Sequence, residues 1–203
     1  MTRKEAILNA ATDLFARKGY KGTAVSEIAE RADVAQGTVF HHFKSKENLL
    51  ISICDELVNT YLNGITRAAE GYGSGWDALE RILKFNRDFK KERYNSIAVV
   101  FRETRDLPMA GSDVHEHFCG LVNQVIEAKS KCIERGVADG SINPVPPYKT
   151  ALLVHFLLVG MFHIETEGLL DLPDLDEELL EFCRRSLTPS DSVEIKTAHG
   201  CGG

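Results

Sequence analysis

The chain has 203 residues, of which 43% are hydrophobic, and a formal net charge of −6. That length holds one large domain, or a small domain fused to a larger one. The charge is uneven, because residues 1–50 carry eight Lys/Arg and six Asp/Glu, whereas residues 51–203 carry 16 and 24. The acidic total excludes a generally basic nucleic-acid-coating protein, but the local basic excess can mark a partner surface.

Targeting and membrane signals are weak. No apolar segment typical of a signal peptide follows the first residues. The longest apolar run, Ala151–Ile164, is interrupted by His155 and His163, so we expect a buried helix that is too short to span a bilayer. Five cysteines, without a CxxC pair, are typical of reduced thiols. These features predict a cytoplasmic protein with no membrane association.

The first 50 residues predict three short helices and the start of a fourth. A capping box at residues 2–5 begins the first helix, which Gly19 ends. Thr23 is expected to cap the second helix, and a tight turn then leads to a third helix, Gln36–Phe43. Ser45 is expected to cap the fourth helix.

The third helix has an unusually polar and aromatic outer side. Val39 and Phe43 are four residues apart and are predicted to point inward. Two short helices joined by a tight turn, with an earlier helix behind them, form a helix-turn-helix pattern, whose second helix can enter a major groove. The pattern predicts DNA contacts by Gln36, Gly37, Thr38, Phe40, His41 and His42, and phosphate contacts by Lys44 and Lys46. The alternative is a solvated helix face. A shared metal ion is excluded, because adjacent helical histidines diverge by about 100°.

The segment GYKGTAVSEIAERADVAQGTVFHHFKSKENLL resembles the DNA-binding domain of the TetR (tetracycline-repressor) family of bacterial regulators, and the resemblance runs from about Arg3 to Leu57. It implies that Gln36, Gly37 and Thr38 face bases and phosphates. It also implies phosphate contacts by Thr23, His42 and Lys46. Phe40 departs from the family, which usually has tyrosine there; the ring contact is kept and a phosphate hydrogen bond is given up. The residues that match the family pattern are Phe15, Gly19, Thr23, Ile28, Ala29, Val34, Gly37, Thr38, His42, Phe43, Lys46 and Leu49.

The rest of the chain predicts an all-α fold, since no long stretch alternates with a period of two. We expect a helix-turn-helix domain at 1–48, with its second and recognition helices at about 24–43, then a helical domain at 49–187 and a disordered tail at 188–203. The family resemblance implies that the second domain binds ligand and forms a dimer. Its predicted helices beyond the fourth are Trp76–Lys91, Ser96–Arg105, Val114–Arg135, Tyr148–Glu167 and Asp174–Leu187.

The predicted helix Tyr148–Glu167 is apolar on nearly every side and therefore needs cover on every side. A second copy related by a twofold axis can cover its outer face, and Asp174–Leu187 would complete a four-helix interface. The alternative is a core helix covered within one chain.

Apolar side chains in the second domain can line a cavity for a largely apolar small molecule, although the same spacing also suits plain core. The candidates for the cavity wall are Phe85, Phe89, Val100, Phe101, Phe118, Val122, Val125, Phe156 and Met161. The polar candidates are Arg102, Glu103, Asn123, Gln124, His155, His163 and Glu165.

Catalytic and metal signals are sparse. His115 and Cys119 share a helix face, but no partner cluster completes a zinc site, and no cysteine has an activating cluster beside it. No Gly-rich phosphate loop, GxSxG or HExxH motif occurs. We therefore expect no enzyme and no cofactor. The resemblance implies a repressor that binds palindromic operator DNA as a homodimer and is released by a small molecule; a helical enzyme and a ligandless DNA-architecture protein are the alternatives.

Overall fold

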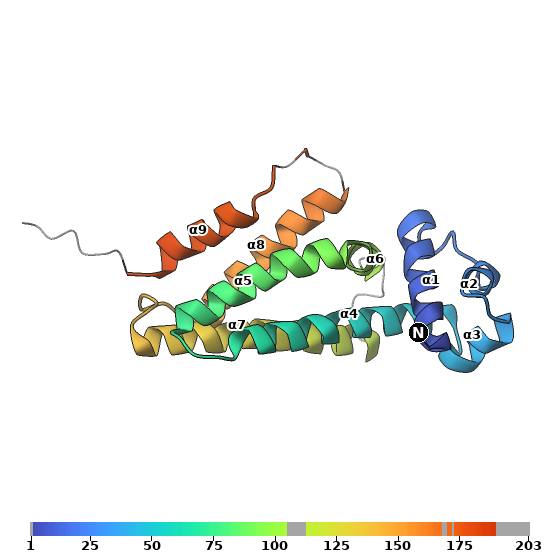
Figure 1. Ribbon diagram of the computed structural model, residues 1–203, viewed down its shortest axis with the longest axis horizontal. Coiled ribbons are helices and arrows are strands. Elements are labelled where there is room, and N and C mark those ends of the chain that lie inside the picture. The colour runs from blue at the N-terminus through green and yellow to red at the C-terminus, as the bar shows by residue number, and fades with distance from the viewer. Residues whose placement is uncertain (1, 105–112, 168–169, 172, 190–203) are drawn as a thin grey trace, which may run out of the picture.

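The computed structural model describes the chain except for residues 1, 105–112, 168–169, 172 and 190–203, and gives no side-chain surroundings for residues 104, 113–118 and 167. The described residues form nine helices and no strand, which confirms the all-α prediction (Figure 1). The helices are α1 (Arg3–Lys18), α2 (Val25–Arg31), α3 (Gln36–Phe43), α4 (Lys46–Ala69), α5 (Gly75–Glu92), α6 (Tyr94–Thr104), α7 (Asp113–Asp139), α8 (Pro147–Glu167) and α9 (Asp176–Leu187).

Helices α1, α2 and α3 form a small unit at one end of the molecule, on the right of Figure 1. Its core is built from one apolar stripe of each helix and is joined by the first turns of α4; the fully buried members include Ile7, Phe15, Ile28 and Leu49. Helix α4 leaves this unit and continues for 24 residues into the larger bundle. The expected boundary between residues 48 and 49 therefore falls inside a continuous helix.

The helix ends follow local sequence signals. Thr2 Oγ1 accepts a hydrogen bond from the Glu5 backbone N–H at 3.2 Å, and the Glu5 carboxylate accepts one from the Thr2 N–H at 2.8 Å. Gly19, after the last turn of α1, has a φ of 76°, which favours glycine. Ser45 Oγ accepts from the Asn48 N–H at 3.0 Å, as expected for the cap of α4.

The predicted cap of α2 was wrong. Ala24, not Thr23, is the N-cap residue of α2, and the Glu27 carboxylate accepts a hydrogen bond from the Ala24 N–H at 3.0 Å. The Thr23 hydroxyl instead donates to the carbonyl oxygen of Gly19 at 2.8 Å. The threonine therefore secures the end of α1 rather than the start of α2.

The predicted end of α7 at Arg135, with Gly136 following as its cap, was also wrong. The helix continues to Asp139, because Gly136 provides room for a close contact and does not act as a cap. A Cβ atom at Gly136 would lie 2.5 Å from Ile142 Cδ1, and one at Gly75 would lie 2.0 Å from the Gly136 nitrogen. The start of α5 thus packs directly against the backbone of α7.

Helix α8 matches the predicted helix Tyr148–Glu167 to within one residue, but its apolar run Ala151–Ile164 is not buried on every side within one chain. Among the described residues, Pro147–Thr166 is a 20-residue span that is long and apolar enough to cross a membrane by length and composition alone, and most of it is not buried within the chain. A single helix of this kind is weak evidence for a membrane span. Its inner side includes Ala151 and Val154, which are buried against α7 and its neighbours. Its outer side leaves large apolar side chains exposed: Leu153 by 65%, Phe156 by 60% and Leu157 by 42%.

Candidate functional site

Helix α3 presents one side to the core of the N-terminal unit and the other to solvent. Val39 and Phe43 are each only 3% exposed, which confirms their predicted inward direction. Phe40 is 43% exposed and lies on the outer side. The other outward residues are Gln36, Gly37, His41 and His42, and Thr38 is half-buried. A helix held by two buried side chains therefore offers a row of hydrogen-bonding and aromatic groups to a partner.

Gly37 has no structural reason within the chain to be glycine. It is the second residue of α3, and a Cβ atom at this position would meet nothing within 4 Å. Glycine in a helix interior is destabilising by about 0.5–1 kcal/mol relative to alanine. An unforced helical glycine on an exposed face fits a position where an external molecule approaches the backbone.

The start of α1 lies beside α3, an arrangement that the sequence analysis missed. Thr2, Arg3 and Lys4 share an open hollow of about 610 Å³ with Gly37, Thr38, His41 and His42. Arg3 and Lys4 are exposed, and neither forms an ion pair among the described residues. The available signal was two basic residues in the first turn of a helix, where the positive end of the helix dipole does not favour them.

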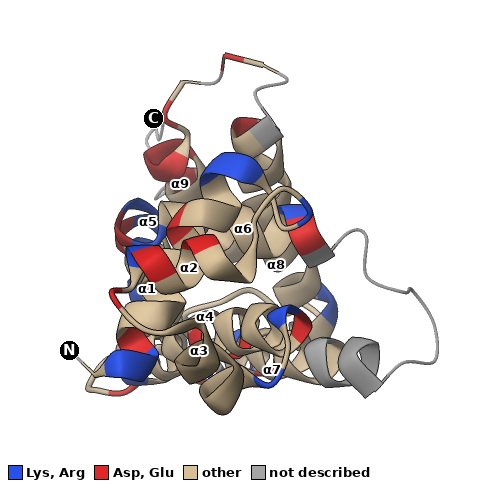
Figure 2. Cartoon of the chain, turned by 90° about the vertical axis from the view of Figure 1, so that its right-hand side faces the viewer, with Lys and Arg blue, Asp and Glu red and all other residues tan. Residues whose placement is uncertain are grey.

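Charge around α3 comes from its neighbours, because α3 itself contains no Lys, Arg, Asp or Glu. Figure 2 views this end of the molecule and shows the tan α3 close to the blue residues that follow the N-terminus. Two other basic residues of the unit are paired internally: Lys18 pairs with Glu27 and Arg31 with Asp13, each at 2.5 Å. Lys44, at the end of α3, is exposed and has no ion-pair partner in the described part of the chain.

Two of the residues expected to contact phosphates are engaged inside the protein. Thr23 is 2% exposed, so the structure does not support a phosphate contact by its hydroxyl. Lys46 Nζ donates to the carbonyl oxygens of Tyr20 at 2.9 Å and Thr23 at 3.0 Å, and lies 4.3 Å from the centroid of the Tyr20 ring. An ammonium group has three donors, so Lys46 retains one for an external acceptor. Its first role is to hold the start of α4 against the loop between α1 and α2.

The larger bundle contains a partly open cavity of about 370 Å³, which is lined by α4, α5, α6, α7, α8 and the first residue of α9. Its volume lies within the range of about 300–1,000 Å³ typical of small-molecule sites. Seven of the nine residues expected to line a cavity do so: Phe89, Val100, Phe101, Val122, Val125, Phe156 and Met161.

The two remaining wall candidates have other positions. Phe85 does not line the cavity, because its ring packs on Gly64 of α4, where an added Cβ would lie 2.0 Å from Phe85 Cζ. Phe118 lies outside the described side chains.

Polar groups enter this apolar cavity at a few points. Lys129 of α7 is fully buried, and its Nζ lies 3.2 Å from Nδ1 of His155 on α8. Burial lowers the pKa of Lys129 to about 7, and burial together with the neighbouring ammonium group lowers the pKa of His155 to about 4. The Tyr61 hydroxyl donates to Asn86 Oδ1 at 2.7 Å. His155 was a predicted polar candidate, whereas Lys129 was missed, although it falls on the apolar stripe of α7 that contains Val122, Val125 and Ile133.

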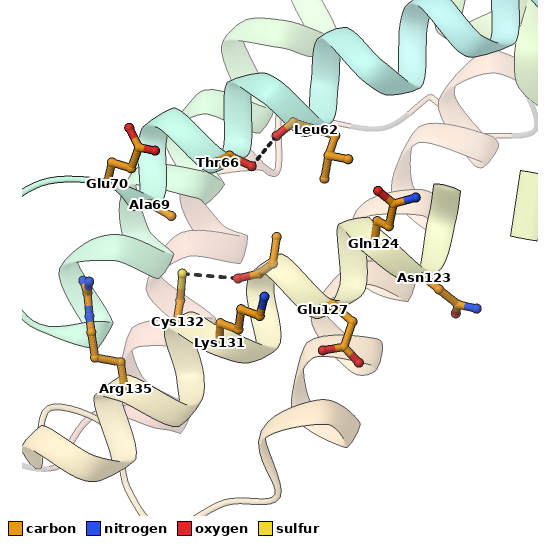
Figure 3. Close-up of a pocket in the computed structure, with 11 residues that line it drawn as sticks. Leu62, Thr66, Ala69, Glu70, Asn123, Gln124, Glu127, Lys131, Cys132 and Arg135 are labelled. Atoms are coloured by element: carbon orange, nitrogen blue, oxygen red, sulfur yellow. Dashed lines mark hydrogen bonds between the residues drawn. The ribbon is translucent and has the colours of Figure 1, made fainter. Parts of the chain in front are cut away.

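Asn123 and Gln124, two further polar candidates, face a different hollow. This hollow has a volume of about 830 Å³. Figure 3 shows the residues that line it, which come from α4 and α7. Its lining carries both acidic residues, Glu70 and Glu127, and basic residues, Lys131 and Arg135. Mixed charge in an open surface hollow gives no preference for one ligand class. His163 and Glu165 are absent from the cavity lining, and Glu165 lies 3.4 Å from Lys90 Nζ.

Helix α6 connects the cavity with the N-terminal unit. Its residues Ile97, Val100 and Phe101 line the cavity. The next two residues reach α1: Arg102 donates to the carbonyl oxygens of Phe15 and Ala16, and Glu103 Oε1 accepts from the Tyr20 N–H at 3.1 Å. Both carbonyls lie in the last turn of α1; the Phe15 carbonyl also accepts from the Gly19 N–H at 2.9 Å, so Arg102 adds a second donor to it. Arg102 and Glu103 therefore bind the end of α1 to the cavity wall.

Metal and thiol chemistry finds little support in the described residues, which contain no group of three or more His, Cys, Asp or Glu placed to hold a metal ion. The predicted pair of His115 and Cys119 is only partly visible, because His115 lies outside the described side chains and Cys119 is exposed. Cys54 and Cys183 are buried, which raises the pKa of their thiols to about 12 and about 11. Such thiols are unreactive near neutral pH.

An exposed recognition helix in a helix-turn-helix unit, joined by one long helix to a bundle with a cavity, defines a DNA-binding regulator of the two-domain, all-helical class. The model of the family described as "Bacterial regulatory proteins, tetR family" matches residues 7–53. The chain is 30% identical over 190 residues to the HTH-type transcriptional regulator YhgD of Bacillus subtilis (strain 168), covering 88% of this chain and 90% of that protein. The chain therefore belongs to the TetR family of transcriptional regulators.

Solved structures share the fold. A bacterial regulatory protein of the tetR family from Rhodococcus RHA1 superposes with a TM-score of 0.76 at 23% identity, covering 94% of this chain and all of that one (100%). AibR, solved in complex with isovaleryl coenzyme A and operator DNA, superposes with a TM-score of 0.69 at 19% identity, covering 90% and 96% of the two chains. At these identities the likeness concerns the fold alone.

Proposed function

We propose that the protein is a ligand-responsive repressor, which binds palindromic operator DNA as a homodimer and is released when a small molecule occupies the cavity. The observation that carries this proposal is the double role of α6, which lines the cavity and also holds the end of α1. A ligand that displaces α6 would move the N-terminal unit. The alternative of a ligandless architectural protein fits less well, because its core would be filled where this one leaves about 370 Å³.

DNA contact would use the outer side of α3. Gln36, Thr38, Phe40, His41 and His42 would lie at base edges and the adjoining sugars and phosphates, and Gly37 would let the helix approach closely. Arg3, Lys4 and Lys44 would bind phosphates, because they are exposed beside α3 and form no ion pair with the residues that the structure describes. Lys46 would contribute at most its remaining donor. The proposed site of action is the bacterial cytoplasm, where the DNA is.

Dimerisation would use the uncovered side of α8 together with α9. Leu153, Phe156 and Leu157 form an exposed apolar patch on α8, and Phe182 of α9 is 54% exposed. Gly160 lies further along α8, and a Cβ atom there would meet nothing within 4 Å, so a second helix can approach closely. A second copy supplies a matching apolar face across a twofold axis. The two α3 helices would then read the two halves of a palindrome.

The proposal is tested by protection of DNA. The purified protein should protect a palindrome upstream of its own gene, and log K should fall with log salt with a slope of about −0.9 per phosphate neutralised. Lys44→Ala should flatten that slope by about one unit per subunit, whereas Lys131→Ala, on α7 away from α3, should not change it. A wild-type protein that binds this DNA no better than unrelated sequence, or a slope unchanged by Lys44→Ala, would contradict the assignment of α3 and its end.

A further inference from the structure

Lys129 is a buried cation without a counter-charge. Its side chain is fully buried, and no carboxylate of the described residues lies within ion-pair distance of its Nζ. Its neighbours are the Nδ1 atom of His155 at 3.2 Å and the Tyr61 ring, whose centroid lies 5.7 Å away. An ammonium group in such surroundings loses its hydration and gains little in return. The His155 and Tyr61 surroundings are thus a poor environment for a charged ammonium group.

The other charged groups that line the cavity are already paired. Lys90 Nζ lies 3.1 Å from Asp176 Oδ2 and 3.4 Å from Glu165 Oε2. Arg87 pairs with Asp88 and Glu177. Among the described lining residues, Lys129 is therefore the cation left to receive a ligand's negative charge.

Apart from these charged groups and the polar Tyr61, Asn86 and His155, the cavity wall is hydrocarbon. Aromatic rings from α4, α5, α6 and α8 line the cavity, and Phe101 and Phe162 lie with ring centroids 5.4 Å apart. A ligand that fits this space needs an apolar body, and a single lysine at one point matches a single negative charge. A carboxylate meets both requirements, because its oxygens accept charge-assisted hydrogen bonds from an ammonium group.

We propose that the cavity binds a small apolar carboxylic acid as its carboxylate, with the acid group hydrogen-bonded to Lys129 Nζ and the hydrocarbon part against the aromatic wall. This inference rests on the proposed function, because it names the ligand class of the cavity assigned there to the effector. The site selects acids over their neutral amides by the charge of Lys129, and selects apolar acids over polar ones by its walls.

Proton linkage follows from the same geometry. Burial lowers the pKa of Lys129 to about 7, and the groups that face it are His155, whose pKa is lowered to about 4, and Tyr61, whose pKa is raised by burial. A bound carboxylate favours the ammonium form and raises the pKa of Lys129. Acid binding therefore takes up protons above pH 7. The affinity should be level just below pH 7 and fall by up to about tenfold per pH unit above it.

The test is calorimetry on the full chain with octanoate and octanamide, an acid and a neutral amide of matched size. Octanoate should bind at least about tenfold more tightly than octanamide, since a hydrogen bond to a charged group is worth that factor or more. Lys129→Met should remove the preference. Lys131→Met, at an exposed position on the same helix, should keep it. Titrations at pH 8 in two buffers of different ionisation enthalpy should show proton uptake with octanoate and none with octanamide.

The inference is overturned if wild type binds octanoate no more tightly than octanamide, or not at all, or if the preference survives in Lys129→Met. The wild-type comparison and the proton uptake do not need the variant, so they decide the matter even if Lys129→Met fails to fold. Binding of labelled upstream DNA is measured separately, without acid. Intact DNA binding with no octanoate binding contradicts this inference alone, whereas octanoate binding without any DNA binding contradicts the proposed function alone.

Discussion

Phe40 is the residue at which the recognition helix departs from the TetR-family pattern, which usually has tyrosine there. The ring is 43% exposed, so a hydroxyl added to it would meet solvent or DNA and would not be buried without a partner. Phe40→Tyr should keep the melting temperature and raise DNA affinity about tenfold or more per dimer through a phosphate hydrogen bond. The gain should be much the same for all sequences, because phosphates carry no base information.

Phe40→Ala completes that test. It should weaken the operator complex without destabilising the fold, whereas Val39→Ala, at a position 3% exposed, should destabilise the N-terminal unit. Melting curves without DNA, beside operator titrations, separate the two effects. Large stability losses in both Phe40 variants would show that Phe40 is part of the core and that the outward face of α3 is wrongly assigned.

Gly37 offers a second prediction at the residue scale. Gly37→Ala adds a methyl group where nothing lies within 4 Å, so the free protein should be stabilised, by at most about 0.5–1 kcal/mol because the residue is in the first turn of α3. Operator affinity should nevertheless fall, because the methyl group would keep the helix from its close approach to DNA. Chemical unfolding and DNA titration measure the two opposite changes; unchanged or tighter DNA binding would mean that the backbone at Gly37 does not approach the DNA.

Lys129 predicts a pH dependence of stability. Its folded-state pKa of about 7 lies below the ordinary value of 10.5, so the unfolded chain binds more protons at this residue between those two pH values. The burial of charged Lys129 therefore lowers the free energy of unfolding by its full amount below pH 7. Above pH 7 this cost falls as the pH rises, by up to about 1.4 kcal/mol per pH unit. Lys129→Met should stabilise the protein most near pH 7 and progressively less towards pH 10. The measurement is the free energy of unfolding in urea, compared between Lys129→Met and wild type across this pH range, with Lys131→Met as control. A difference that does not change with pH would contradict the burial of Lys129 as a charged group.

At the scale of elements, α6 carries the expected communication between the two parts of the molecule. Arg102 and Glu103 hold the last turn of α1 and the Tyr20 N–H, while Val100 and Phe101 line the cavity. The distance along the chain between Arg102 and its partner carbonyls is more than 80 residues, so this contact is a property of the folded protein.

Arg102→Met should weaken the effect of a ligand on DNA binding while leaving ligand affinity in the cavity unchanged. Substitutions along such a connection change the coupling between two sites by about 0.5–2 kcal/mol. The coupling is measured as the ratio of DNA affinities with and without saturating octanoate. Arg67→Met, an exposed arginine on α4, is the control. If the ratio in Arg102→Met equals that of wild type, the signal does not pass through this contact.

At the scale of the whole molecule, a single chain leaves the apolar outer side of α8 exposed to solvent. Leu157→Glu and Leu153→Glu would each place a charge in the proposed dimer interface, at a cost of several kcal/mol if it stays ionised. Sedimentation should show a dimer for wild type and a monomer for each variant. Tyr72→Glu, at a fully exposed loop position away from α8, should stay dimeric. A wild-type monomer at micromolar concentration would rule out a second copy as the cover of α8. Leu158 is unsuitable for this test because it packs against the chain's own core.

The sequence by itself determined the helices and the outward face of the recognition helix. The bounds of α3, its inward Val39 and Phe43, and the Ser45 cap follow from spacings of three or four residues, which one helix turn brings together whatever the rest of the chain does. Predictions from local spacing were wrong where one residue type suits two different structural roles. Gly136 suits a cap or a close contact, and Thr23 suits the start of one helix or the end of another.

Only the tertiary structure decided which polar groups are free and which are used internally. Lys46 meets the carbonyl oxygens of Tyr20 and Thr23, and Lys129 meets His155, across 23 to 26 residues of chain. From the sequence alone, a lysine on an apolar stripe can be either buried or exposed at the edge of the helix. The positions of the opposing helices decide between the two. The exposed side of α8 was likewise undecided, since the composition of a helix shows how much apolar surface must be covered but not which neighbour covers it.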